Sequence, residues 1–222
     1  VDEMTSQTSL LESILQYHVI SGQRITSDQI SSGESPATLE GGTITINVAD
    51  DGTVTLNGIP VSTTDVQTEN AVIHLIDGVL LQRINAVERA SITAAFSTLT
   101  DLVGQAGLAN ALSGPGPDGE DGITVFAPTD AAFEGVDTSE LSDSELESLL
   151  QYHVVDDIYF SDDLPMGEPL TTLEGSNVVV GQNQSTLNPS TDTSNVVVPD
   201  VEVSNGVIHG VDAVLSIPSS DN

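Results

Sequence analysis

The sequence predicts an α+β fold that is present twice, once in part and once complete. Two observations support this prediction. Apolar residues at helical spacing lead into runs of β-branched residues, so helices come first and strands follow. Two segments also recur at a constant distance, which indicates a duplicated domain. With 222 residues and 38% apolar content, the chain is long enough to form two cores of ordinary size.

The duplication is visible in two pairs of segments. LLESILQYHVI at residues 10–20 returns as ELESLLQYHVV at residues 145–155, with eight of eleven positions identical. NAVIHLIDGVL at residues 70–80 returns as NGVIHGVDAVL at residues 205–215, with seven of eleven identical. Both pairs lie 135 positions apart, which is a domain length and too long for a solenoid repeat.

The helices of the complete copy come first. Residues 92–112 have apolar positions at helical spacing, and Gly104 and Gly107 divide them into two short helices. A further helix is predicted to run to about Gln151, with Ser142 or Asp143 as its N-cap.

Strands make up the rest of the domain. ITVFAPT at residues 123–129 predicts a short buried strand, and Thr129 or Asp130 caps a brief helix after it. Valine-rich runs separated by glycine, proline and asparagine predict further strands from residue 152 onward. In the first copy, Asn57 and Gly58 predict a β-hairpin turn.

These elements predict four regions along the chain. Residues 1–82 form the C-terminal part of a domain, 83–91 a short linker, 92–218 a complete domain and 219–222 a tail. Val1 corresponds to Val136, so the first copy lacks a counterpart of the strand at 123–129 and exposes a sheet edge. We expect an upstream segment to fill this gap in the intact protein.

The charge balance is extreme, with 34 acidic residues against three arginines and no lysine. A net charge of −31 would repel nucleic acid and anionic lipid, and no apolar run is long enough to span a bilayer. Self-repulsion of this size disfavours the compact state unless salt screens it. The composition therefore predicts a salt-adapted, halophile-type protein that interacts with neither nucleic acid nor the membrane interior.

Three motifs of the second copy resemble the fasciclin (FAS1) family in order and spacing. They are TVFAPTDAAF at residues 124–133, LLQYHVV at 149–155 and NGVIHGVDAVL at 205–215. The first copy carries the second and third motifs. The resemblance implies a wedge-shaped β-sandwich with helices along one edge, one copy being partial and one complete.

The resemblance also implies a function. It implies a secreted or cell-surface adhesion module that is not an enzyme and needs no cofactor. Its partners would be other surface proteins, the extracellular matrix or extracellular polysaccharide. The tyrosine–histidine segment has been linked to adhesion in some family members, and here it corresponds to Tyr17, His18, Tyr152 and His153.

Other functional interpretations stay open. The four histidines recur between copies, which favours a structural role inside strands over catalysis, because a catalytic histidine need not be duplicated. A cryptic hydrolase acting on polysaccharide or esters is one alternative, and a passive spacer in an envelope protein is another. Asn183 begins a glycosylation triplet, whereas the acidic loop at 118–122 lacks the spacing of an EF-hand, so no metal ligand is assigned.

Overall fold

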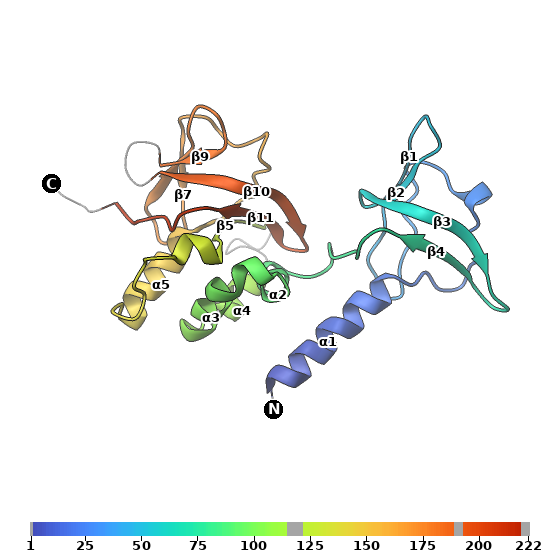
Figure 1. Ribbon diagram of the computed structural model, residues 1–222, viewed down its shortest axis with the longest axis horizontal. Helices are drawn as coiled ribbons and strands as arrows, with labels where there is room; N and C mark the ends of the chain where they lie inside the picture. The colour runs from blue at the N-terminus through green and yellow to red at the C-terminus, as the bar shows by residue number, and fades with distance from the viewer. Residues whose placement is uncertain (1, 115–121, 189–192, 219–222) are drawn as a thin grey trace. The chain divides into compact units, whose positions relative to one another are not determined.

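The computed structural model describes residues 2–114, 122–188 and 193–218, with backbone alone for residues 2–7. The chain divides into two compact units, Val1–Arg83 and Ile84–Asn222 (Figure 1). Both units combine helices with β-sheet, so the predicted α+β class is confirmed. Each unit is described separately below.

The first unit consists of one long helix followed by an antiparallel sheet. The helix α1 covers Asp2–Tyr17, and a short 3-10 turn follows at Ser27–Gln29. The four strands pair in chain order, and they are β1 (Ile46–Val48), β2 (Val54–Leu56), β3 (Ile59–Gln67) and β4 (Val72–Ile76). Within the described residues β4 pairs only with β3, so its other edge has no strand beside it.

The predicted hairpin joins β2 to β3. Asn57 has a φ of 47° and Gly58 a φ of 80°, as a two-residue turn with two left-handed positions requires. The strands meet directly beside this turn, where Leu56 pairs with Ile59. The hairpin prediction is therefore confirmed.

The second unit begins with a layer of short helices. These are α2 (Ala86–Ser91), a 3-10 turn at Ala94–Phe96, α3 (Ser97–Gln105), α4 (Ala109–Ser113), a 3-10 turn at Asp130–Phe133 and α5 (Asp143–Tyr152). Ser142 is the N-cap of α5, and its hydroxyl accepts a hydrogen bond from the Glu145 N–H at 3.3 Å. Gly107 lies between α3 and α4, so the predicted division into two short helices is confirmed.

A five-stranded mixed sheet forms the body of this unit. In spatial order its strands are β6 (Val154–Val155), β5 (Ile123–Pro128), β11 (Gly206–Val211), β10 (Ser194–Val203) and β9 (Thr186–Leu187). A separate antiparallel pair consists of β7 (Pro169–Thr171) and β8 (Asn177–Val179). The central pairing of β5 with β11 is parallel, so the strand before α5 lies beside a strand from the end of the chain.

The expected linker at 83–91 is mostly not a linker. Residues 86–91 form α2, whose N-cap is Asn85, and the helix packs its apolar side into the core of the second unit. The Asn205 side chain accepts a hydrogen bond from the Ala86 N–H at 2.9 Å and anchors the start of the helix. Residues 83–91 were assigned to a linker because they lie between the bounds of the two copies, whereas Val87 and Ala90 pack against the apolar core of the second unit.

One capping prediction is also corrected. Thr129 is the N-cap residue of the 3-10 turn that follows β5, but its side chain makes no capping bond. The Asp130 carboxylate instead accepts hydrogen bonds from the Ser97 hydroxyl at 2.7 Å and the Thr98 N–H at 2.8 Å. It therefore caps the beginning of α3, a helix more than 30 residues away in sequence.

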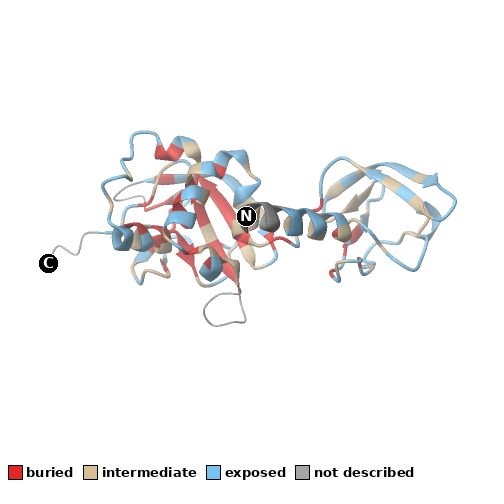
Figure 2. Ribbon diagram, turned by 90° about the horizontal axis from the view of Figure 1, so that it is seen from below, coloured by how far each residue is buried: buried red, intermediate tan, exposed pale blue. Residues whose placement is uncertain are grey.

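Buried apolar residues of the second unit form two clusters. The first lies between the helical layer and one face of the sheet, and it includes Phe96, Leu146 and Ile208. The second lies on the other side and includes Phe126, Tyr152 and Leu215. Among its described residues, the first unit has one smaller cluster around Tyr17, Ile44 and Leu80. Figure 2 shows the buried residues concentrated in the second unit, while residues 8–16 of α1 are exposed or intermediate.

Candidate functional site

The two tyrosine–histidine pairs predicted as an adhesion segment occupy equivalent places. Tyr17 and Tyr152 are the last residues of α1 and α5, and His18 and His153 follow them directly. Tyr17 is 2% exposed, Tyr152 0% and His153 3%. Three of the four side chains therefore point into the protein, and a partner cannot touch them in this conformation.

In the second unit the Tyr152 hydroxyl lies at the centre of a buried polar network. It donates a hydrogen bond to the Asn177 carbonyl oxygen at 2.9 Å and accepts one from the Asn188 side-chain nitrogen at 3.1 Å. The Asn188 side-chain oxygen accepts a further bond from the Val179 N–H at 2.9 Å. The tyrosine thus connects the end of α5 to the β8 strand and the loop after β9.

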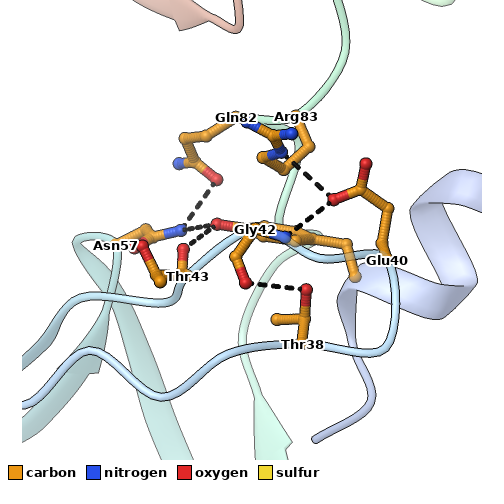
Figure 3. Close-up of polar contacts among 8 residues, drawn as sticks. Thr38, Glu40, Gly42, Thr43, Asn57, Gln82 and Arg83 are labelled. Atoms are coloured by element: carbon orange, nitrogen blue, oxygen red, sulfur yellow. Dashed lines mark hydrogen bonds and ion pairs between the residues drawn. The ribbon is translucent and has the colours of Figure 1, made fainter.

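The first unit repeats this network, and Figure 3 labels two of its members, Thr43 and Asn57. The Tyr17 hydroxyl donates to the Thr43 carbonyl oxygen at 2.7 Å and accepts a bond from the Asn57 side-chain nitrogen at 2.8 Å. The Asn57 side-chain oxygen accepts a bond from the Thr45 N–H at 2.8 Å. Each copy is therefore stabilised internally by the same three bonds at the equivalent place.

Sequence reasoning missed the two asparagines. Both have left-handed backbone conformations, with φ at 47° for Asn57 and 48° for Asn188, which asparagine tolerates better than most residues. They lie 131 positions apart rather than 135, because the loop between the two motifs differs in length. Aligning the hairpin turn of the first copy with the segment after β9 would have revealed them.

The histidines that follow the helices each connect two backbone groups. His153 Nδ1–H donates to the Leu149 carbonyl oxygen at 2.7 Å, and its Nε2 accepts a bond from the Leu215 N–H at 2.9 Å. His18 makes the equivalent bonds to Ile14 and Leu80, at 2.7 and 3.0 Å. These histidines lie at helix ends rather than inside strands, which corrects part of the prediction. Their role in satisfying backbone groups is as predicted.

The other two histidines do lie in strands, β4 and β11. His209 Nε2–H donates to the Tyr159 carbonyl oxygen at 2.8 Å, and its Nδ1 accepts a bond from the Asp200 N–H at 3.2 Å. His74 Nε2–H donates to the Ile25 carbonyl oxygen at 2.8 Å, but its buried Nδ1 has no partner among the described residues. The copies therefore differ at this one nitrogen.

Burial shifts the pKa values of these groups. Loss of hydration lowers the pKa of His153 to about 4. The hydrogen bond to the Leu149 carbonyl opposes this shift but is the smaller effect. Burial also lowers the pKa of His209, and it raises the pKa values of Tyr17 and Tyr152. The network is therefore uncharged at neutral pH. Because both ring nitrogens of His153 and His209 have backbone partners, neither ring is free to act as a general base.

The remaining contacts of the first network are polar and closer to the surface. The Arg83 guanidinium and the Glu40 carboxylate form an ion pair at 3.1 Å, and Glu40 also accepts a bond from the Gly42 N–H at 3.2 Å (Figure 3). The Gln82 side-chain oxygen accepts a bond from Asn57 at 3.3 Å. These bonds attach the last residues of the first unit to its own loop.

Asn183 lies in an exposed turn between β8 and β9, where its side-chain oxygen accepts a bond from the Ser185 N–H at 3.3 Å. Its glycosylation stays a prediction. The acidic loop at 118–122 lies outside the described residues except for Gly122, and the tail at 219–222 lies outside them entirely. Over residues 8–114, 122–188 and 193–218, no group of three or more histidine or acidic residues is arranged to hold a metal ion. No helix in those ranges is long and apolar enough to cross a membrane.

Fold and site together define a class of protein: an α+β domain that occurs in pairs and whose tyrosine, histidine and asparagine side chains serve its own backbone. The chain belongs to the fasciclin domain family, whose model matches residues 1–82 and 94–218. The family assignment made from the three motifs is therefore confirmed.

Several known proteins are similar to this chain. Transforming growth factor-beta-induced protein ig-h3 of Sus scrofa is 31% identical over 230 residues, which cover 99% of this chain and 32% of that protein. Periostin of Homo sapiens is 29% identical over 211 residues, covering 93% of this chain and 24% of that protein. The uncharacterized protein sll1735 of Synechocystis is 34% identical over 136 residues, covering 59% of this chain and 96% of that protein. The chain thus spans about a third of the length of the first of these relatives.

A solved structure has the same fold. It is a FAS1 domain pair from the insect cell adhesion molecule Fasciclin I, with a TM-score of 0.53 and 20% sequence identity. The match covers 93% of this chain and 80% of that one. It confirms the predicted FAS1-type fold.

Proposed function

We propose that this chain is an adhesion module of a secreted or cell-surface protein, where it binds other surface proteins, the extracellular matrix or extracellular polysaccharide. Membership of the fasciclin family supports this, as does the similarity of nearly the whole chain to ig-h3. The solved domain pair is part of a cell adhesion molecule, which supports the same class of function.

One structural observation carries the mechanism. The tyrosine and histidine side chains of the adhesion segment form hydrogen bonds within each unit. A binding partner is therefore recognised by other residues on the exposed surface. That surface is strongly acidic, because the whole chain has 34 acidic residues and only three arginines. The partner therefore carries neutral or basic groups, such as sugar hydroxyls or basic protein patches.

A binding experiment tests the function. Beads carrying the full chain are expected to retain neutral polysaccharides or cell-surface proteins in 2 M KCl, and heat-unfolded chain on matched beads is the control. Hydrolysis of ester or glycoside substrates by the soluble chain would favour the hydrolase interpretation instead. Absence of binding at every salt concentration would leave a passive spacer as the better description.

Salt adaptation is the second part of the proposal. Raising KCl from 0.1 M to 2 M shortens the screening length from about 10 Å to below about 3 Å and weakens the repulsion between carboxylates. We expect the midpoint of thermal unfolding to rise by roughly 5 °C, which corresponds to about 1–2 kcal/mol for units of this size. KCl is used in place of a sulfate salt, because sulfate also stabilises folded proteins by being excluded from their surface. A midpoint that is flat or falls with KCl would contradict salt adaptation.

A further inference from the structure

A small cavity lies inside the second unit, between the helical layer and the sheet. Its volume is about 40 Å³, and its walls come from the helices α2 to α5 and from the strands β5 and β6. Phe126 and Val154 are almost fully buried and form its inner wall, whereas Val87, Ala90 and Thr100 are half-buried on the side of α2 and α3. The cavity therefore extends from the outer helices to the central sheet.

The side chains around this cavity are almost all hydrocarbon. Among its described lining residues, only Thr100 and His153 have polar side chains. The Thr100 hydroxyl donates its hydrogen to the Phe96 carbonyl oxygen at 2.9 Å, and both ring nitrogens of His153 have backbone partners. The polar capacity of the lining side chains is therefore used up, apart from the remaining acceptor sites of the Thr100 oxygen.

The cavity is large enough for water but does not suit it. One water needs roughly 10–15 Å³ of cavity volume, so a volume of about 40 Å³ exceeds that need. A water there would have the Thr100 oxygen as its one side-chain partner among the described residues, whereas buried waters typically make about three hydrogen bonds. Apolar cavities of this kind stay dry, and their lining atoms lack the contacts that a guest atom would supply.

We propose that this cavity is a binding site for a small, neutral, apolar molecule, such as a short hydrocarbon or a dissolved apolar gas. The volume limits the guest to a few heavy atoms, and the walls favour apolar contact. A net charge of −31 repels anions, and a cation would be buried without a counterion, since none of the described lining residues is acidic. The site lies in the interior, so the proposal does not depend on the adhesive function of the surface.

A guest in this cavity is expected to stabilise the second unit. It contacts Leu99, Val103 and Leu150, which belong to the core cluster between the helical layer and the sheet. The cavity exists only in the folded chain, and a molecule that binds the folded but not the unfolded state raises stability by mass action. The midpoint of thermal unfolding of this unit should therefore rise with the concentration of the guest.

Xenon is the probe for the test, because it is apolar and occupies dry cavities in proteins. The methyl NMR signals of the full chain are followed as the xenon pressure is raised. We expect saturable shifts at Val103, Leu150 and Val154, and none at Leu164 and Leu170, which belong to the cluster on the other side of the sheet. Unshifted signals of the three lining residues would overturn the proposal. A long-lived water beside them, detected by a nuclear Overhauser effect, would also overturn it.

Matched variants locate the site, while the test on the unmodified chain needs no variant to fold. Ala90→Val adds two methyl groups at the cavity wall and is expected to abolish the saturable shifts. Ala109→Val makes the same change at a residue that packs against the same core without lining the cavity, and it is expected to keep them. Leu150→Ala enlarges the cavity and is expected to admit benzene, which the parent excludes. Full xenon shifts in folded Ala90→Val would mean that the guest binds elsewhere.

Discussion

Replacing Gly206 by alanine is expected to prevent the second unit from folding. Gly206 opens β11 with a φ of 147°, a backbone conformation available essentially only to glycine. A Cβ atom there would overlap the carbonyl oxygen of Ile123 and lie 2.8 Å from its carbonyl carbon and nitrogen. These atoms are backbone of the neighbouring strand and cannot rotate away. We expect a loss of more than about 4 kcal/mol, a large part of the stability of such a domain.

Thermal unfolding, monitored by hydrogen exchange, would measure the change in stability of each unit separately. The control is Gly104→Ala in α3, where an added Cβ meets nothing within 4 Å. That change is expected to stabilise the second unit by about 0.5–1 kcal/mol, because alanine has the better helix propensity. The chain contains its own comparison, since the first copy carries Ala71 at the position of Gly206. Near-normal stability of Gly206→Ala would mean that β5 and β11 do not pair as described.

Acidification is expected to weaken the second unit through His153. The pKa of His153 is about 4 in the folded chain and close to 6.5 when unfolded. The unfolded chain therefore binds a proton first as the pH falls. The contribution of this residue is fully present above pH 6.5 and is lost between pH 6.5 and about 4. The loss amounts to about 2 kcal/mol by pH 5 and about 3 kcal/mol by pH 4.

The pH effect is isolated by comparison with His153→Gln, which cannot titrate. The variant is expected to be less stable at pH 7, because the Leu149 carbonyl and the Leu215 N–H lose their ideal partner. Its stability should fall by about 2 kcal/mol less than that of the parent between pH 7 and pH 5. Hydrogen bonds lower the pKa values of Asp130 and Glu145 in the same unit, but these carboxyl groups contribute equally to the parent and the variant, so their effect cancels in the comparison. Parallel pH profiles for parent and variant in 2 M KCl would contradict the role of His153.

Much of this protein could be predicted from local patterns. The 135-residue repeat indicated two copies, and the three motifs indicated the family. The strand at 123–128, the Asn57–Gly58 turn and the Ser142 cap were each predicted because their residues act on near neighbours. Local hydrogen bonding and backbone preference are encoded within a few residues, so the sequence shows them directly.

Contacts between distant segments could not be predicted from local sequence patterns. The assignment of 83–91 to a linker was wrong for α2, because this helix is held by the Asn205 side chain, about 120 positions away, and by the core of the second unit. Asp130 caps α3 rather than the turn beside it for the same reason. The asparagine partners of the two tyrosines were missed because their spacing departs from that of the motifs.

The sequence by itself determined the duplication, the family and the structural role of the repeated histidines. Only the tertiary structure decided that the tyrosine–histidine segment faces inward, and that Leu11 and Leu15 are uncovered while Leu146 and Leu150 are buried. The physical reason is that the two similar helix sequences present the same apolar stripe in both copies. Whether that stripe is buried depends on the elements that pack against it, and those elements lie elsewhere in the chain.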